Sequence, residues 1–317
     1  MSIALVTDST SGLDLREIEG VQVRIVPLSV IVDAQEYEEN VNISPEQISA
    51  HLRAGRAVST SRPSPSAFSD TYLDLQREGI TRILSMHLSA ELSGTCEAAR
   101  LAAASVGSAE LTVQVVDTQT SGAVLGYALT KSAQAVALGR EATSAAPSLT
   151  DLGALVTGIC SQRSRTLFYV ATLEYLRRGG RIGSAASLLG SALAIKPLLH
   201  MRDGKVQTLE KVRTEAKALA RLKTLSLEAA AGYRDVARSE QRSPRVRFYV
   251  QHFDAPEAAD RLLEQLLEGA SDLSKYSGVH LSAAGDVCEI SVVLGAHVGP
   301  GMLAVTIVDD GAKPTEE

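Results

Sequence analysis

Four hydroxyl-rich segments are the first candidates for chemistry in this sequence. They lie at residues 8–11, 59–64, 89–95 and 117–122, after strand-like runs or directly before predicted helices. Hydroxyls and free backbone N–H groups at a helix start suit an anion, because the donors and the positive end of the helix dipole converge there. Helix caps and turns favour the same residue types. The segments therefore indicate an anion site if the fold brings them to one edge of a sheet.

The usual phosphate and nucleophile motifs are missing. No G-x-x-x-x-G-K-[ST] segment occurs, and no G-x-G-x-x-G follows a strand-like run. Ser93 lies in Leu92-Ser93-Gly94-Thr95, which lacks the G-x-S-x-G frame of a nucleophile elbow. A nucleophilic serine also needs a base within hydrogen-bond reach, and we interpret the nearby His87 as structural. A Ser93-dependent esterase or thioesterase stays open as an alternative, as does a binder of another small anion.

Two glycine-rich segments in the second half carry a charged or titratable side chain. Gly179-Gly180-Arg181 lets the backbone turn tightly and presents a guanidinium suited to a carboxylate or phosphate. The same segment also fits a helix C-cap with basic neighbours. His297 lies in the segment 295–301, which predicts a glycine-rich loop between two strands that a ligand or another backbone segment can approach closely.

Composition excludes several classes of function. The chain has 317 residues, of which 45% are hydrophobic and 21% charged, as expected for a globular protein of two domains. A net charge of −6, few aromatic residues and no Trp argue against nucleic-acid binding. Cys96, Cys160 and Cys288 form no C-x-x-C pair, so neither a zinc ribbon nor a disulfide framework is predicted. Without a secretory signal or a long apolar run, we expect a cytoplasmic protein with no stable membrane insertion.

The first half of the chain alternates strand and helix patterns, which favours an α/β fold with a parallel sheet covered on both faces. The acidic run 36–39 has no metal-ligand pattern and is expected to be a solvated loop. A linker is predicted at 141–150. Strands are expected at 3–7, 21–32, 83–87 and 112–116, and helices at 44–52, from 64 to about 79, at 93–105 and at 122–138, the last closed by Gly139.

The second half predicts a mixed sheet with helices on one face. Asp203-Gly204 between two alternating runs is a hairpin signal. An exposed connection is expected at 232–244 and a frayed tail at 311–317. Strands are expected at 167–172, 245–251, 287–294 and 302–308, and helices at 214–231 and 256–268.

Taken in order, seven segments make the chain similar to the DegV family of bacterial fatty-acid-binding proteins along nearly its whole length. Each segment is weak alone, but their order and spacing are specific. They are Val6-Thr7-Asp8-Ser9-Thr10-Ser11, Thr60-Ser61-Arg62-Pro63-Ser64, Leu92-Ser93-Gly94-Thr95, Val116-Asp117-Thr118 with Ser121 and Gly122, the segment 173–182 around Gly179-Gly180-Arg181, Leu193-Ala194-Ile195-Lys196-Pro197-Leu198-Leu199, and the segment 295–301 around His297.

The resemblance implies a fold and a ligand. It implies an N-terminal Rossmann-like three-layer domain with a parallel sheet over residues 1–150, and a C-terminal two-layer domain with a mixed sheet over 151–310. A long-chain fatty acid is then expected in a tunnel between the domains. Its carboxylate is expected at Thr60, Ser61, Ser93 and Gly94. No metal and no cofactor other than this bound ligand are implied.

The resemblance also implies a partner and no enzymatic activity of the chain's own. A separate fatty-acid kinase would phosphorylate the presented carboxylate to an acyl phosphate. Arg181 and His297 match family positions near the carboxylate or the kinase-facing surface. The family often has Gln in the middle of T-S-Q-P-S, where this chain has Arg62. That extra cation either strengthens carboxylate binding or points to solvent, and it makes a larger anionic head group conceivable.

Overall fold

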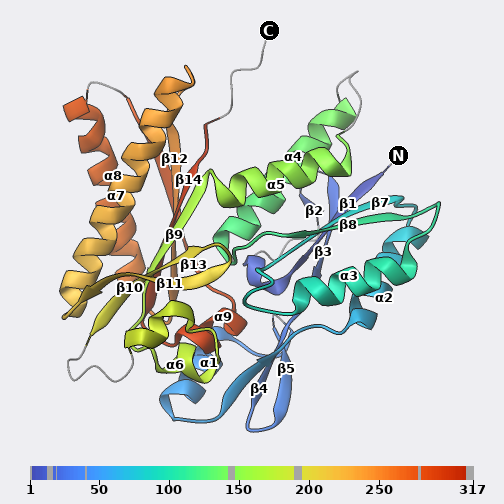
Figure 1. Cartoon of the computed structure of the whole chain (residues 1–317), viewed down its shortest axis with the longest axis horizontal. Helices are drawn as coiled ribbons and strands as arrows, with labels where there is room; N and C mark the ends of the chain where they lie inside the picture. The colour runs from blue at the N-terminus through green and yellow to red at the C-terminus, as the bar shows by residue number, and fades with distance from the viewer. Residues whose placement is uncertain are drawn as a thin grey trace. The chain divides into compact units, whose positions relative to one another are not determined.

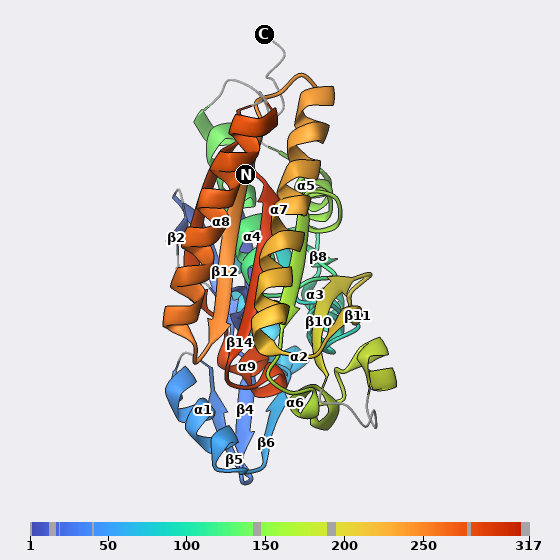
Figure 2. The ribbon, with the colours of Figure 1, turned by 90° about the vertical axis from the view of Figure 1, so that its left-hand side faces the viewer.

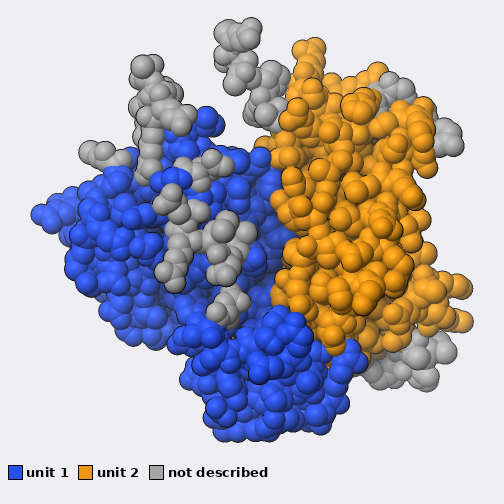
Figure 3. Space-filling view, turned by 180° about the vertical axis from the view of Figure 1, so that it is seen from behind, with its two compact units in different colours: residues 1–162, 203–205, 291–296 blue, residues 163–202, 206–290, 297–317 orange. Residues whose placement is uncertain are grey.

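The computed structural model describes residues 2–12, 17–18, 20–39, 41–141, 147–188, 195–277 and 280–311. The chain forms two compact units, coloured separately in Figure 3. Both contain strands and helices, so the predicted α/β class is confirmed. Unit 1 comprises residues 1–162, 203–205 and 291–296, and unit 2 comprises residues 163–202, 206–290 and 297–317.

Unit 1 is built on a largely parallel sheet with strand order β2-β3-β1-β7-β8 (Figure 1). β2 is antiparallel to β3, and the other pairs are parallel. β1 is buried along its whole length, because a central strand of such a sheet is covered on both faces. The strands are β1 (Ile3–Asp8), β2 (Glu17–Ile18), β3 (Val21–Val26), β7 (Arg82–His87) and β8 (Thr112–Asp117).

Helices cover both faces of this sheet, as the sequence predicts. On one face, Phe68 and Tyr72 of α2 and Ala98 of α3 pack against Val6 and Ile83. On the opposite face lie α4 and α5 (Figure 1), which contact β1, β7 and β8. The helices are α2 (Pro65–Arg77), α3 (Thr95–Val106), α4 (Ala123–Glu141) and α5 (Leu149–Ser161).

Two details around α4 and α5 differ from the sequence pattern. The predicted helix end at Gly139 is wrong, because α4 continues to Glu141 and a helix tolerates an interior glycine at a cost of about 1 kcal/mol. The expected domain boundary near residue 150 falls at the start of α5, which packs on α4, β7 and β8 within unit 1. Residues 142–146 of the predicted linker lie outside the described residues.

A smaller antiparallel sheet in unit 1 has the order β5-β4-β6. The helix α1 begins at the predicted capping box, in which Ser44 and Gln47 each accept a hydrogen bond from the other's backbone N–H. The predicted solvated loop at 36–39 is wrong, because Gln35–Glu38 pairs with β4 and Glu39 is buried. The elements are β4 (Ser29–Val32), β5 (Gln35–Glu38), β6 (Val58–Ser61) and α1 (Pro45–Arg53).

Unit 2 is a two-layer structure with a mixed sheet of strand order β11-β10-β9-β14-β12-β13. β12 and β13 are parallel, whereas β14 is antiparallel to both of its neighbours. The helices α7 and α8 lie side by side on one face (Figure 2). Strands and long helices are β9 (Ser164–Tyr169), β10 (Lys196–Arg202), β11 (Lys205–Val212), β12 (Arg245–Phe253), β13 (Ser282–Glu289), β14 (Met302–Asp309), α7 (Glu215–Ser239) and α8 (Pro256–Ser277).

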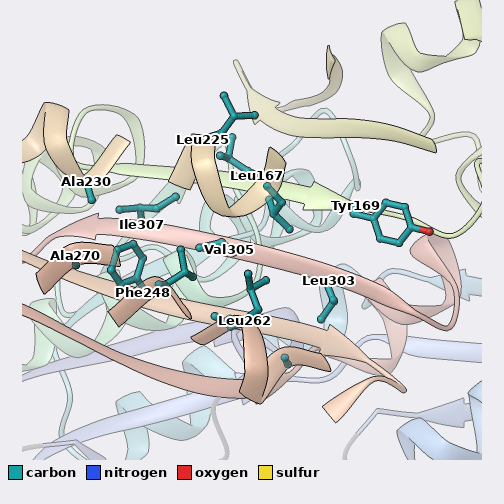
Figure 4. Close-up of a cluster of buried hydrophobic side chains, with 14 of the residues drawn as sticks. Leu167, Tyr169, Leu225, Ala230, Phe248, Leu262, Ala270, Leu303, Val305 and Ile307 are labelled. Atoms are coloured by element: carbon teal, nitrogen blue, oxygen red, sulfur yellow. The ribbon is translucent and has the colours of Figure 1, made fainter. Parts of the chain in front are cut away.

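The core of unit 2 lies between these helices and the sheet (Figure 4). Leu225 of α7 and Leu262 of α8 pack against Phe248, Val305 and Ile307. β14 supplies the centre because all eight of its residues are buried. The predicted two-layer domain with a mixed sheet is therefore confirmed.

The connections of unit 2 are partly as predicted. Asp203 and Gly204 both have positive φ, at 51° and 76°, which is the hairpin turn that the Asp-Gly pair predicts between β10 and β11. The expected exposed connection at 232–244 is wrong in its first part, because α7 continues to Ser239 with Ala237 buried on its inner face. Residues 312–317 of the predicted tail lie outside the described residues.

A buried ion pair anchors the end of β14. Asp309 receives two hydrogen bonds from the Arg242 guanidinium, one of them at 2.7 Å between Nη1 and Oδ1. The two residues are 3% and 8% exposed. Arg163 adds a hydrogen bond from Nη2 to the backbone carbonyl of Asp309 at 2.8 Å. Arg242 Nε also donates to Glu240 at 2.6 Å, so removing the Asp309 carboxylate would leave the buried guanidinium with only that one charged partner.

We predict that Asp309→Ala lowers the free energy of unfolding by about 1.5–3 kcal/mol, because a buried guanidinium loses two charged hydrogen-bond acceptors and keeps only Glu240. Asp286→Ala is the matched control. It removes the partner of Arg247 at an exposed position of the same sheet, where the loss is at most about 1 kcal/mol. Urea unfolding followed by circular dichroism measures both, and equal losses would contradict the prediction.

Candidate functional site

The Asp8 carboxylate joins the carboxyl ends of β1 and β7. It is fully buried and accepts hydrogen bonds from the backbone N–H of Thr10 at 3.1 Å and of Leu88 at 2.9 Å. The hydroxyl of Thr10 donates to it at 2.5 Å, and His87 Nδ1 lies 3.1 Å away. These contacts fix the short 3-10 helix η1 (Ser9–Ser11) and the start of the loop from β7 to α3.

His87 continues this contact into a buried hydrogen-bond chain. Its Nε2 lies 2.7 Å from Ser85 Oγ, which lies 2.7 Å from the hydroxyl of Tyr72. With the ring proton on Nδ1 facing Asp8, Nε2 accepts from Ser85, and Ser85 accepts from Tyr72. Burial raises the pKa of Tyr72 and so keeps this hydroxyl a donor. Ser85, His87 and Asp8 are connected like a hydrolase triad, but Ser85 is fully buried, and we interpret the chain as structural.

Ser93 stands at the start of α3, where Gly94 is the N-cap residue and supplies no side-chain cap. Ser93 Oγ lies 2.9 Å from Thr95 Oγ1, and the Ser93 N–H donates to the carbonyl of Ser89 at 3.1 Å. In the described part of the chain, no histidine or carboxylate hydrogen-bonds to Ser93, and both ring nitrogens of His87 have other partners. The geometry thus lacks the base that a serine nucleophile needs.

The segment Thr60–Ser64 meets the turn before α3. Thr60 and Ser61 are half-buried at the end of β6, and Ser64 caps α2 by accepting from the N–H of Ala67 at 3.2 Å. Between them, Arg62 Nη1 donates to the carbonyl of Gly94 at 3.2 Å. The structure therefore brings Thr60, Ser61 and Arg62 together with Ser93 and Gly94 inside unit 1.

Glu39 is a buried carboxylate that the sequence analysis missed. It is 1% exposed, and its Oε1 accepts from the N–H of Val293 at 3.3 Å. Burial raises its pKa above the ordinary range, and hydrogen bonds from Ser9 and Ser291 oppose that change. The run of acidic residues before Glu39 suggested a solvated loop, and no local signal pointed to a partner 254 residues away.

In unit 2, Arg181 follows the C-terminus of α6 (Glu174–Arg178). Gly180 has φ +72° and donates to the carbonyl of Arg177, while the N–H of Arg181 donates to the carbonyl of Leu176 at 3.0 Å. This is the helix C-cap geometry that the sequence allowed. Arg181 is half-buried, and its Nη1 donates to the carbonyl of Gly179 at 2.5 Å.

His297 lies in the last turn of α9 (Val292–Val298), so the predicted loop at this position is wrong. The run from Val292 is apolar and buried, and packing of that face outweighs the cost of Gly295 within the helix. A Cβ at Gly179 would come within 2.0 Å of His297 Nδ1, so the imidazole packs directly on the backbone of that glycine. The structure thus places His297 against the turn after α6 that carries Arg181, within unit 2.

The environment of His297 favours its neutral form. Burial lowers its pKa to about 4, and the positive charge of Arg181 contributes in the same direction. The imidazole is therefore uncharged near pH 7, so of these two side chains only Arg181 is positively charged.

None of the helices in the described ranges is both long and apolar enough to cross a membrane. Among the same residues, no group of three or more His, Cys, Asp and Glu side chains is placed to hold a metal ion.

Comparison with known proteins identifies the family. The sequence profile described as "Uncharacterised protein, DegV family" matches residues 2–310. The chain belongs to the DegV family. A DegV domain-containing protein of Streptomyces coelicolor is 38% identical over 305 residues, which cover 96% of this chain and 98% of that protein.

Solved DegV structures share the fold. A DegV family protein from Thermus thermophilus, described as fatty-acid binding, is 34% identical with a TM-score of 0.78, covering 98% of this chain and all of that one. DegV from Bacillus subtilis, described as a fatty acid binding protein, is 27% identical with a TM-score of 0.77 over the same shares. The two-domain α/β fold of the DegV family therefore extends across this chain.

We predict that His297 makes unit 2 sensitive to acid. The pKa of about 4 in the folded chain lies below the ordinary value of 6.5, so the unfolded chain binds the proton first as the pH falls. The contribution of neutral His297 to the free energy of unfolding is complete above about pH 6.5. Roughly 2–3 kcal/mol of it is lost as the pH falls from there to 4.

Urea unfolding of the wild type and of His297→Asn at several pH values measures this loss. The difference in unfolding free energy between the two proteins should be largest at pH 7.5 and should shrink toward pH 4. Arg181→Gln should weaken the same pH dependence, because it removes the neighbouring charge. A difference that is constant with pH would contradict the prediction.

Proposed function

We propose that this chain binds a long-chain fatty acid with its carboxylate at the turn formed by Thr60–Arg62 and Ser93–Gly94. The observation that carries the proposal is the contact of Arg62 with Gly94, which unites two hydroxyl-bearing segments distant in sequence. The fatty-acid-binding descriptions of the relatives from T. thermophilus and B. subtilis support the same ligand.

The hydroxyl groups at this turn suit a carboxylate. Ser93 and Thr95 share one hydrogen bond and so use only one of their two protons between them. Thr95 is fully buried, whereas Ser93 is half-buried. When Thr95 donates to Ser93, the Ser93 proton is free to donate to a ligand oxygen. Hydrogen bonds to a charged acceptor are the stronger kind, and they hold the anion without a buried counter-ion.

The acyl chain supplies most of the binding free energy in this proposal. Each buried methylene contributes roughly 0.8 kcal/mol, so a chain of about sixteen carbons binds tightly with few polar contacts. The expectation that the chain lies in a tunnel between the domains stays a prediction.

We further propose that the protein presents the bound acid to a cytoplasmic fatty-acid kinase and is not itself an enzyme. The sequence holds no phosphate-loop motif, so the phosphoryl donor would bind the partner. A carboxylate oxygen would attack the terminal phosphorus of that donor, and the nucleoside diphosphate would leave. Arg181 and His297 are the candidates for the kinase-facing surface. Arg181 supplies a guanidinium suited to an acidic patch or a phosphate, beside the exposed Gly180.

We predict that Ser93→Ala and Thr60→Ala each weaken fatty-acid binding and leave the fold intact. Each removes one hydroxyl donor to a charged group, worth roughly 1.5–3 kcal/mol or about one to two orders of magnitude in Kd. Displacement titrations with oleate and palmitate measure the effect. Ser69→Ala, a half-buried serine on α2, is the control and should bind like the wild type. Wild-type affinity in both site variants would place the carboxylate elsewhere.

We predict that Arg181→Ala keeps fatty-acid binding but slows phosphorylation by the cognate kinase, because a docking charge is lost. Labelled phosphate transfer to protein-bound oleate, run beside a lipid titration, separates the two effects. Arg213→Ala, an exposed arginine elsewhere in unit 2, is the control. Loss of lipid binding with normal turnover per bound lipid would instead assign Arg181 to the carboxylate site, and no change in either assay would leave it a C-cap residue.

A further inference from the structure

Gly94 provides the space that the Arg62 guanidinium occupies. A Cβ at position 94 would come within 2.0 Å of Arg62 Nη1 and 3.0 Å of its Cδ. The backbone of Gly94, at φ −73° and ψ 11°, is open to any residue, so its conformation does not require glycine. The absence of a side chain is what lets the arginine lie flat against the turn.

The positive charge of Arg62 is not neutralised by the described residues. The one hydrogen bond that its guanidinium makes among these residues goes to the neutral carbonyl of Gly94, and no carboxylate among them pairs with it. The first turn of α3, where the N–H groups and the positive end of the helix dipole lie, begins at the same point without a side-chain cap. The acidic residue of that turn, Glu97, has its own partner in Arg100.

A carboxylate carries one negative charge and offers two oxygens. A phosphate ester carries about −1.5 to −2 at pH 7 and offers three strongly accepting oxygens. The planar fork of a guanidinium pairs with two of these at once. A carboxylate can pair with the same fork through both of its oxygens, but it then has no further oxygen for the serine and threonine donors of the proposed site, which the third oxygen of a phosphate can accept from.

We propose, on the basis of the proposed function, that Arg62 makes this site prefer an acyl ligand with a phosphoryl head group over the same chain ending in a carboxylate. The ligand class is a long-chain phosphate monoester or acyl phosphate. Arg62 is then the residue that determines selectivity, and Gly94 is the residue that makes room for it. The protein would hold the phosphorylated product more tightly than the substrate acid.

Competitive titration with hexadecyl phosphate and hexadecanoate at pH 7.5 tests the proposal. The readout is the ratio of the two Kd values. Wild type should favour hexadecyl phosphate, and Arg62→Gln should reduce that preference by about threefold to fivefold, the size expected for a charged contact of an exposed arginine. Gly94→Ala should reduce it similarly, because the new Cβ displaces the guanidinium while the backbone conformation is kept. Arg77→Gln, at the far end of α2 and paired there with Asp74, should leave the ratio unchanged.

The outcomes separate this proposal from the function on which it rests. If the wild type binds hexadecanoate and the ratio is the same in Arg62→Gln, the selectivity role is overturned and fatty-acid binding stands. If the wild type binds neither ligand, both fail. A preference for hexadecyl phosphate that falls in Arg62→Gln and in Gly94→Ala supports the proposal. The wild-type preference should also fall when about 0.5 M salt is added, because salt at that concentration screens an exposed charge.

Discussion

The buried Asp8 carboxylate is the interaction on which the carboxyl edge of the parallel sheet depends. A buried charge is costly unless its oxygens are satisfied, and here two backbone N–H groups, a hydroxyl and a histidine ring converge on it. Those donors come from η1 and from the end of β7, so the loops after two neighbouring strands start from fixed positions. The Ser93 turn is the far end of one of these loops, and its place follows from this anchor.

Beyond that anchor, small and neutral groups control where charge resides in each of the two units. Hydroxyls stand where the carboxylate is proposed to bind, and the imidazole of His297 is kept neutral by burial. The two arginines lie against glycines, Arg62 on Gly94 and Arg181 beside Gly179. Each guanidinium donates to a backbone carbonyl, which is a weak acceptor compared with an anion.

Local signals in the sequence predicted much of the fold. The capping box at Ser44, the Asp203-Gly204 turn and the apolar strands all depend on residues close together in the chain, and each was predicted correctly. The helix around His297 was not, because Gly295 and Gly299 outweighed the apolar run from Val292 in a purely local analysis. Tertiary packing decides that segment.

In the candidate site, too, the sequence predicted the features that depend on neighbouring residues and missed those that depend on distant contacts. The hydroxyl clusters were visible as caps and turns, and the parallel sheet predicted that some would share an edge. The contact of Arg62 with Gly94 depends on which of several side-chain directions the arginine takes, and sequence does not encode that locally. Glu39 was missed for a related reason, since its partners at Ser9 and Val293 come from opposite ends of the chain.

The close packing of α6 against the end of α9 restricts how the sequence can evolve. Gly179 lies against His297, and a Cβ at Gly299, whose φ is +77°, would come within 2.0 Å of the ring of Tyr175. A larger residue at either glycine forces the imidazole or aromatic ring opposite to move or to be replaced by a smaller side chain. These two pairs of positions are therefore expected to change together among descendants of this sequence.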